Sequence, residues 1–402
     1  MFTQALVVAL LSVSARACTG TITSLTDVAA AVACTTINVN GFSVPAGSTF
    51  SLALLAGTTV NILGDISFGT KNWAGPLFSI TGTNVTFNGN DHTFNGQGSF
   101  YWDGHGSSSG TLKPRPMMKF VLSLSPPFLP LRSVPPLFAP PPASLLHTSI
   151  SNIFNPCSTN FLRYRVKTSG LFTNLKILNS PAQVFSVDNA APLTISAITI
   201  DDSLGDSANA ASAGKPAGAN TDGFDVGNQA PLTISGCTVK NQDDCIAINS
   251  GAGVTFTGNH CSGGHGISIG SIDTGDIVSN ITISNNVITS GANGLRIKTI
   301  ATAMGASVSG ITYSGNTVSN VTGFGVLIDQ SYPSTLGTPG NGVVISGINF
   351  VGTNTLTIPS GITPVAVNCG STSCQGTWNW AGLKVSGGAA NKINYKGITG
   401  FP

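Results

Sequence analysis

A five-residue phrase recurs along the second half of this chain and strongly limits what the chain can fold into. In each copy the second residue is Gly or Cys, the third and fifth are apolar, and the fourth varies. The copies occupy residues 222–226, 244–248, 265–269, 293–297 and 324–328, and successive starts lie 22, 21, 28 and 31 residues apart. Repetition at this spacing is typical of stacked coils, none of which can bury its apolar face alone. The repeat therefore predicts a solenoid.

Alternation within the phrase indicates strands rather than helices. The third and fifth side chains would point inward and the fourth outward, while the Gly or Cys would accommodate a bend. Between the copies, short Val, Ile, Phe and Leu runs alternate with Asn, Gly, Ser and Thr, and no helical period is sustained. We therefore expect an all-β, single-domain parallel β-helix whose coils stack about 4.8 Å apart.

Equivalent positions in stacked coils should lie next to one another. Asp222, Asp244 and His265 hold the first position of consecutive phrases and should form a ladder along one outer face. Arg296 and Lys298 would lie two and four residues past the bend on the following coil. Asn residues that recur at turns we interpret as structural, bonding backbone groups or stacking as ladders; examples are Asn84, Asn88 and Asn90.

The composition agrees with this architecture. All 15 acidic residues are Asp, 49 of the 402 residues are Gly, and only 8% are charged. A chain without Glu lacks a residue that keeps surface helices stable and soluble, which argues against bundles, coiled coils and doubly wound α/β folds. The net charge of +2, with Lys and Arg scattered, argues against a nucleic-acid partner. We expect a monomer in which any carboxylate chemistry uses Asp.

The amino terminus resembles a secretory signal peptide. An apolar run over 5–13 is followed by Ala15-Arg16-Ala17, a small-x-small cleavage site directly before Cys18. The run is too short to span a bilayer, and we find no later apolar stretch of about 18 residues, so no membrane anchor is expected. A buried first strand is the alternative interpretation. We favour a signal peptide over 1–17 and a secreted, extracellular chain over 18–402.

Secretion makes the eight Cys residues candidates for disulfides. Proximity in sequence pairs Cys18 with Cys34, Cys245 with Cys261 and Cys369 with Cys374, although connectivity does not follow from spacing alone. Cys157 and Cys237 have no clear partners. Three sequons fit a secreted glycoprotein; they begin at Asn84, Asn280 and Asn320.

Residues 121–165 differ from everything around them. They contain nine Pro, no Gly and no acidic residue. One interpretation is a Pro-rich disordered loop. The interpretation we favour is translated non-coding sequence, such as a retained intron, that interrupts the β-helix domain after Phe120.

The chemically active residues gather on the expected ladder. Three carboxylates would lie on adjacent coils with an imidazole and two cations, in a chain where charge is scarce. These six residues are Asp222, Asp243, Asp244, His265, Arg296 and Lys298. Three neighbouring Asp residues cannot all stay ionised cheaply, so at least one should have a raised pKa. A glycoside-cleaving site needs such a spread, because one carboxylic acid protonates the leaving oxygen while a carboxylate activates water.

At these residues the chain resembles the fungal polygalacturonases, which are pectin-degrading glycoside hydrolases of family 28. Four motifs occur in the order and approximate spacing of that family: Asn220-Thr221-Asp222, Asp243-Asp244, Gly264-His265-Gly266 and Arg296-Ile297-Lys298. Similarity also extends over 73–77, 100–104, 178–181 and 376–380 and covers essentially the mature chain outside 121–165. The resemblance implies a right-handed parallel β-helix and hydrolysis of α-1,4-linked polygalacturonate, the backbone of pectin, with endo action favoured.

The resemblance also implies roles for individual residues. Asp243 would be the general acid, Asp222 and Asp244 would hold and deprotonate the attacking water, and His265 would influence the acid. Arg296 and Lys298 would hold a galacturonate carboxylate, to which Arg offers two parallel donors and Lys a point charge. Tyr332 and Asn220 would contact sugar. The family inverts configuration, which calls for carboxyl groups roughly 6.5–9.5 Å apart, and it needs neither a metal nor another cofactor.

Other interpretations remain open. A pectate lyase would share the coil architecture but would use calcium and a basic residue for β-elimination. A β-helix that only binds cell-wall polysaccharide would release no sugar. Among the remaining polar residues, we assign Asp225 to structure and expect the Cys245 disulfide to fix the site rather than to supply a nucleophile.

Overall fold

The structure is a computed structural model that describes residues 16–107, 111–120 and 168–401. The signal peptide predicted at 1–17 lies almost entirely outside the described residues, and the first strand begins at Arg16. The Pro-rich segment predicted at 121–165 lies wholly outside them, as does Cys157. Both segment assignments stay predictions.

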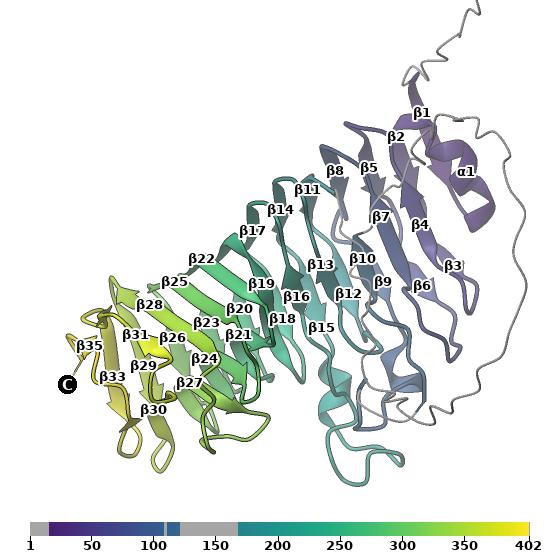
Figure 1. The fold of residues 1–402 in the computed structure, drawn as a ribbon. Helices are drawn as coiled ribbons and strands as arrows, with labels where there is room; N and C mark the ends of the chain where they lie inside the picture. Colours follow the sequence, from purple (N-terminus) through teal and green to yellow (C-terminus); the bar gives the residue numbers. More distant parts are fainter. Residues whose placement is uncertain (1–15, 108–110, 121–167, 402) are drawn as a thin grey trace, which may run out of the picture.

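The chain folds into the predicted all-β, right-handed parallel β-helix, whose coils stack along one axis from the amino to the carboxyl end (Figure 1). Each regular coil contributes one short strand to each of three sheets, and neighbouring coils pair in parallel. The sequence repeat produces this arrangement because an apolar strand of one coil is covered by the equivalent strand of the next.

The three sheets are named here by number. Sheet 1 contains β1 (Arg16–Ile22), β2 (Cys34–Val39), β5 (Thr59–Ile62), β8 (Val85–Asn88), β11 (Gly170–Thr173), β14 (Leu193–Ser196), β17 (Leu232–Ser235), the later part of β19 (Asp244–Thr257), β22 (Ile277–Ser284), β25 (Ala306–Ser314), β28 (Val343–Val351) and β31 (Cys374–Gln375). Sheet 2 contains β3 (Phe42–Val44), β6 (Ile66–Phe68), β9 (Thr93–Asn95), β12 (Lys176–Leu178), β15 (Thr199–Asp201), β18 (Thr238–Lys240), β20 (His260–Ser262), β23 (Val287–Thr289), β26 (Thr317–Ser319), β29 (Asn354–Ile358) and β33 (Leu383–Gly387).

Sheet 3 contains β4 (Phe50–Ala53), β7 (Phe78–Thr81), β10 (Met118–Phe120), β13 (Phe185–Val187), β16 (Phe224–Gly227), the first part of β19, β21 (Gly266–Ile272), β24 (Asn293–Ile300), β27 (Phe324–Tyr332), β30 (Thr363–Asn368) and β34 (Lys392–Ile393). Because β19 runs through a corner, it pairs in both sheet 1 and sheet 3. A separate pair, β32 (Trp378–Asn379) with β35 (Ile398–Thr399), lies near the carboxyl end.

Helices contribute little to the described part of the chain, as the absence of Glu predicted. The α-helix α1 (Val28–Ala31) follows the 3₁₀ helix η1 (Leu25–Asp27) beside the first coil, and two further 3₁₀ helices are η2 (Gly98–Phe100) and η3 (Ser203–Asp206). None of the described helices is long and apolar enough to cross a membrane.

Apolar side chains fill the coil interior. Phe87 stacks on Phe172 with ring centroids 4.2 Å apart, and Phe185 stacks on Phe224 at 5.0 Å. Buried Asn side chains form a ladder across successive coils, with Nδ2 to Oδ1 distances of 3.1, 3.0 and 2.9 Å; the members are Asn259, Asn286, Asn316 and Asn354. The structural interpretation of the recurrent Asn residues is therefore correct for this ladder, which satisfies amide groups inside the coil.

All three predicted disulfides are present, and they join Cys18 to Cys34, Cys245 to Cys261 and Cys369 to Cys374. Cys237 is buried and free. Burial raises the pKa of its thiol to about 12, so this Cys is an unreactive core residue.

The Pro-rich segment falls at one defined turn of the solenoid. It lies between β10, which ends at Phe120 in sheet 3, and β11, which begins at Gly170 in sheet 1. One coil earlier the equivalent turn is residues 82–84, and one coil later it is 188–192. The neighbouring coils thus make this turn with three and five residues, whereas this coil has 121–169.

Candidate active site

The repeated phrases form consecutive strands of sheet 3. Their third and fifth residues are buried, as predicted. The candidate site residues lie shortly before β16, β19 and β21, at the first residue of β19, and on β24 and β27. Phe224 pairs with Ile246, which aligns Asp222 with Asp244 on adjacent coils. Asp243 directly precedes β19, and His265 directly precedes β21.

The predicted ladder is correct for the two Asp residues but wrong for His265. Asp244 pairs with Gly266, whereas Ile246 pairs with Ile267, so Cys245 is an extra residue at the start of β19. This bulge moves His265 opposite Asp243 instead of Asp244. The backbone N–H of His265 donates to the carbonyl of Asp243 at 2.8 Å. Gly264 permits the approach, because a Cβ there would overlap the Asp243 carbonyl oxygen.

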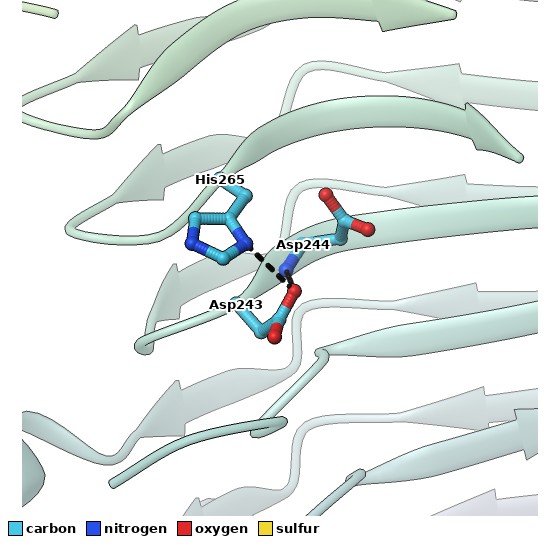
Figure 2. A group of neighbouring side chains, drawn as sticks. All are labelled: Asp243, Asp244 and His265. Atoms are coloured by element: carbon cyan, nitrogen blue, oxygen red, sulfur yellow. Dashed lines mark hydrogen bonds and ion pairs between the residues drawn. The ribbon is translucent and has the colours of Figure 1, made fainter. Parts of the chain in front are cut away.

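Asp243 accepts three hydrogen bonds. Its Oδ1 lies 2.9 Å from His265 Nδ1 and accepts the backbone N–H of Asp244 at 2.8 Å (Figure 2). Its Oδ2 accepts Asn220 Nδ2 at 3.1 Å. Burial opposes ionisation, but the hydrogen bond and charge of His265, together with Lys298 and the Asp244 N–H, lower the pKa of Asp243. Asp243 raises the pKa of His265 in return, so the two form an ion pair.

Asp244 is held by a second cation. Lys298 Nζ donates to Asp244 Oδ2 at 2.7 Å, and Ser268 Oγ donates to Oδ1 at 2.6 Å. The exposed fraction is 1% for the Asp244 side chain and 10% for that of Lys298. Such a short, buried contact fixes the carboxylate in one orientation.

Asp222 carries the raised pKa that the sequence predicted for at least one carboxyl group. Burial raises its pKa well above the ordinary value, and the negative charges of Asp243, Asp225 and Asp244 raise it further. Its Oδ1 is buried and has no hydrogen-bond partner among the described residues. A proton is therefore favoured on Asp222 over Asp243, the residue expected to be the acid.

The two predicted substrate cations lie on β24, one coil beyond His265. The Tyr332 ring, at the end of β27, is close to both: Arg296 Cζ lies 5.9 Å and Lys298 Nζ 5.4 Å from its centroid. Arg296 Nε is buried without a hydrogen-bond partner in the described structure. Asn220 lies on the other side of the cluster, against Asp243. The structure thus brings all eight predicted catalytic and substrate-contacting residues into one region.

A cavity of about 600 Å³ opens over Asp243 and His265. The turns from sheet 2 to sheet 3 form part of its wall, and the loop 203–219 contributes Asp206, Lys215 and Pro216. Lys240, also in the wall, pairs with Asp206 at 2.6 Å. A polar cavity of this size beside an acid and an imidazole can admit a sugar unit.

Asp243, Asp244 and His265 bring possible metal-ligand atoms within 4.8 Å of one another. Those atoms already have partners, because Asp244 binds Lys298 and Ser268 while Asp243 and His265 bind each other. A cation would have to displace an ammonium group. The donor set fits acid–base chemistry better than metal binding.

The same separation corrects one expectation. Inversion was expected to place the carboxyl groups roughly 6.5–9.5 Å apart, but carboxylate oxygens of Asp243 and Asp244 lie within 4.8 Å. The residues are consecutive, and the Asp243 side chain folds back onto the Asp244 N–H, which brings the groups together. Inversion therefore rests on the resemblance and not on this distance.

Two functional neighbours were missed or undervalued in the sequence. Ser268 is the fourth residue of its phrase, an outward position, so the repeat itself could have identified it. Asp225 was assigned to structure alone, yet burial and the charges of Asp244 and Asp243 raise its pKa to about 7. It lines a depression of about 170 Å³ with Asp188 and Asn249. It is therefore electrostatically part of the cluster.

Comparison with known proteins agrees with this geometry. The model of glycosyl hydrolases family 28 matches residues 34–123 and 151–399, and the unmatched stretch between them falls within the predicted 121–165 insert. The chain is 39% identical over 361 residues to an endo-polygalacturonase of Sclerotinia sclerotiorum, covering 88% of this chain and 80% of the relative. It is 38% identical over 375 residues to endopolygalacturonase 1 of Colletotrichum lindemuthianum, covering 91% and 87%.

A solved structure gives the same result. Endopolygalacturonase I from Stereum purpureum, in complex with two galacturonate molecules, superposes with a TM-score of 0.78 at 42% identity and covers 94% of this chain and 98% of its own. Sequence identity, coverage and fold all point to one family. The chain belongs to family 28 of the glycosyl hydrolases.

Proposed function

We propose that this protein hydrolyses the α-1,4 bonds of polygalacturonate by endo attack. Membership of family 28 supports hydrolysis, and the names of the relatives and the galacturonate in the Stereum complex support the substrate. The observation that carries the proposal is the cluster itself, in which Asp243 is paired with His265 while Asp244 is paired with Lys298.

The cluster can supply the proton that hydrolysis needs. Asp222 is the candidate to hold that proton in the free protein, because its pKa is raised, whereas the pKa of Asp243 is lowered beside His265, whose own pKa is raised. Moving that proton to Asp243 leaves Asp222 and Asp244 as carboxylates without adding or removing charge. The proton thus belongs to the coupled group, and substrate binding selects the arrangement that reacts.

In the proposed reaction, Asp243 gives its proton to the glycosidic oxygen as the bond from that oxygen to the anomeric carbon breaks. A water oxygen bonds to the anomeric carbon, and its proton passes to the Asp222 and Asp244 pair. His265 stabilises the Asp243 carboxylate that forms. No metal or cofactor takes part in these steps.

Arg296 and Lys298 supply the positive charge that a polyanionic substrate needs. Arg296 Nε is a buried donor without a hydrogen-bond partner among the residues that the structure describes, and a galacturonate carboxylate can satisfy it. The Tyr332 ring beside both cations offers an apolar face to the sugar. Asn220, which touches Asp243, contacts the sugar on the other side.

Endo attack is supported by the place of the site along the solenoid. Sheet 3 continues on both sides of the cluster, through β13 and β10 toward the amino end and through β27 and β30 toward the carboxyl end (Figure 1). A long substrate can therefore extend past the cluster in both directions.

Secretion is supported by the fungal relatives, and the sequon residues Asn84, Asn280 and Asn320 are all exposed. That the protein acts as a monomer, without nucleic acid or membrane, stays a prediction.

The test is incubation with polygalacturonate, with separate measurement of new reducing ends, ultraviolet absorbance and product length. We expect reducing ends without unsaturated products, and mixed oligomers at early times. Absorbance from unsaturated ends that chelator abolishes would support the lyase alternative, and binding without new ends would support the non-catalytic one. Asp243→Asn should remove turnover and keep the fold, while Asp91→Asn, at an exposed Asp, is the matched control.

A further inference from the structure

A buried lysine outside the cluster is tied to the backbone of a loop that reaches it. The exposed fraction of Lys113 is only 3%. Its Nζ donates to Asp103 Oδ1 at 2.7 Å and to the carbonyl oxygen of Gly106 at 2.6 Å. A buried ammonium group is stable only when such partners compensate it. Lys113 therefore fixes both Asp103 and Gly106 in the short loop 103–107.

The loop is also fixed by its own backbone. The His105 N–H donates to Asp103 Oδ1 at 2.9 Å, and the Gly104 N–H donates to the carbonyl oxygen of Ala217 at 2.9 Å. Lys113 lowers the pKa of Asp103 against the effect of its burial, which keeps this carboxylate charged. The loop 103–107 is thus attached to the segment that leads to Asn220.

The end of this loop determines the orientation of the Asn220 amide. The Ser107 N–H donates to Asn220 Oδ1 at 3.0 Å, and Ser107 Oγ donates to the same oxygen at 3.3 Å. A backbone N–H can only donate, so the amide oxygen of Asn220 must face Ser107. The amide nitrogen then faces the opposite way and donates to Asp243 Oδ2 at 3.1 Å.

The two oxygens of Asp243 consequently differ. Oδ1 lies between the Asp244 N–H and His265, whereas Oδ2 accepts only Asn220 among the described residues. A proton that leaves Asp243 for a glycosidic oxygen therefore leaves from Oδ2. The Asn220 amide then stabilises the carboxylate that remains.

We propose that Lys113 and Asp103 are positioning residues, which hold the loop 103–107 so that Ser107 turns the Asn220 amide toward the proton-donating oxygen of Asp243. Without Lys113, the buried carbonyl of Gly106 loses its donor and the loop moves to reach water. The Asn220 amide oxygen then loses its bonds from Ser107, and the hydrogen bond from the amide nitrogen that favours the charged form of Asp243 weakens. This inference rests on the proposed function and adds two residues that do not line the cavity over Asp243 and His265.

The test compares Lys113→Met with wild type in turnover, KM and pH dependence. We expect kcat to fall roughly ten- to hundredfold, the range for losing a hydrogen bond to a charged group, with a smaller rise in KM because Asn220 also contacts the sugar. The pH limb assigned to Asp243 should move upward, because its anion has lost a donor. Lys396→Met, at an exposed lysine, is the matched control and should change neither.

Epistasis separates positioning from general damage to the fold. In an Asn220→Ala background, Lys113→Met should have little further effect on kcat, because its route to Asp243 is already absent. Equal fold-losses in both backgrounds, or an unshifted pH limb, would overturn the proposal. Asp103→Asn is the second variant if Lys113→Met does not fold, and it should reproduce the same pH shift.

A measurement without turnover distinguishes failure of this inference from failure of the proposed function. The carboxyl ¹³C shift of Asp243 reports its protonation directly in the folded protein. The Asp243 titration should move upward in Lys113→Met whether or not polygalacturonate is the substrate. An unchanged titration in a folded variant would reject the positioning role.

Discussion

Replacing Lys298 by Met tests the electrostatic structure of the cluster. Met has a similar length and fills the same space, but it leaves the Asp244 carboxylate, 1% exposed, without the ammonium group 2.7 Å away. Ser268 then remains as its side-chain donor, on the other oxygen. Breaking a buried ion pair by removing one partner destabilises a protein by about 3–5 kcal/mol.

The size of the effect on melting follows from chain length. With an unfolding entropy of about 2.1 cal/mol/K per residue and roughly 340 described residues, the total is about 0.7 kcal/mol/K. The melting temperature of Lys298→Met should therefore fall by roughly 4–7 °C at neutral pH.

Calorimetry on folded protein measures this shift, and circular dichroism confirms that the variant retains its sheets. Lys384→Met is the matched control, because Lys384 is exposed and, within the described parts of the chain, its Nζ donates to the carbonyl of Ala381 alone. This variant should stay within about 0.5 kcal/mol of wild type. The double variant with Asp244→Asn should be less destabilised than the sum of the single variants. Additive effects, or a Lys298→Met protein that melts within a degree of wild type, would refute the reasoning.

Three further predictions concern residues around the site. Asp202→Asn should stabilise the protein increasingly as pH rises above about 4. Burial raises the pKa of Asp202 in the folded state, and its Oδ2 has no partner among the described residues. An equal change in melting temperature relative to wild type at pH 4 and pH 7 would contradict this. Gly264→Ala should destabilise by roughly 1–3 kcal/mol and lower kcat, since the new Cβ would meet the Asp243 carbonyl and displace His265; unchanged activity would show that the turn can adapt. Deleting 121–165 should raise the yield of soluble protein, because residues 166–169 then connect β10 to β11 with four residues, between the three and five of the neighbouring coils. An unchanged or lower yield would count against the interpretation of 121–165 as an insert. A spliced transcript that still encodes this segment would also contradict that interpretation.

The periodic part of the fold could be predicted from sequence because the coils repeat. Once the 222–226 and 244–248 phrases are aligned, the register of Phe224 with Ile246 and the alignment of Asp222 with Asp244 follow. The disulfide between Cys245 and Cys261 follows from the same stacking, since these residues are only 16 positions apart. Local repetition fixes these contacts without knowledge of the loops.

The bulge at Cys245 could not be predicted in this way. Counting from phrase to phrase places His265 beside Asp244, and only the extra residue in β19 moves it opposite Asp243. The resemblance to family 28 did place His265 beside the acid. A match to a family motif assigns the role of a residue even when the bulge that positions it is not visible in the sequence. Periodicity alone describes an ideal coil, and functional sites are where real coils depart from it.

The contacts that do not follow the repeat could not be predicted from the sequence either. Lys298 meets Asp244 across 54 positions, and Ser107 meets Asn220 across 113. The contact between Lys298 and Asp244 could have been inferred by stacking the coils from β19 through β21 to β24. The contact between Ser107 and Asn220 depends on a loop that does not repeat from coil to coil, so its position does not follow from the periodicity. The low pKa of Asp243 likewise depends on donors that converge from separate coils. Composition indicated that charge was scarce but not how it was paired.

The most direct test of the proposed chemistry is time-resolved proton NMR of a defined galacturonate oligomer in D₂O with the wild-type protein. The account predicts new reducing ends that appear first as the β anomer, with saturated non-reducing ends, and no reaction with Asp243→Asn. Unsaturated ends would contradict hydrolysis, and an α anomer formed first would contradict single displacement by water. A protein that folds, binds the oligomer and leaves it intact would contradict the central claim that the Asp222, Asp243 and Asp244 cluster cleaves polygalacturonate.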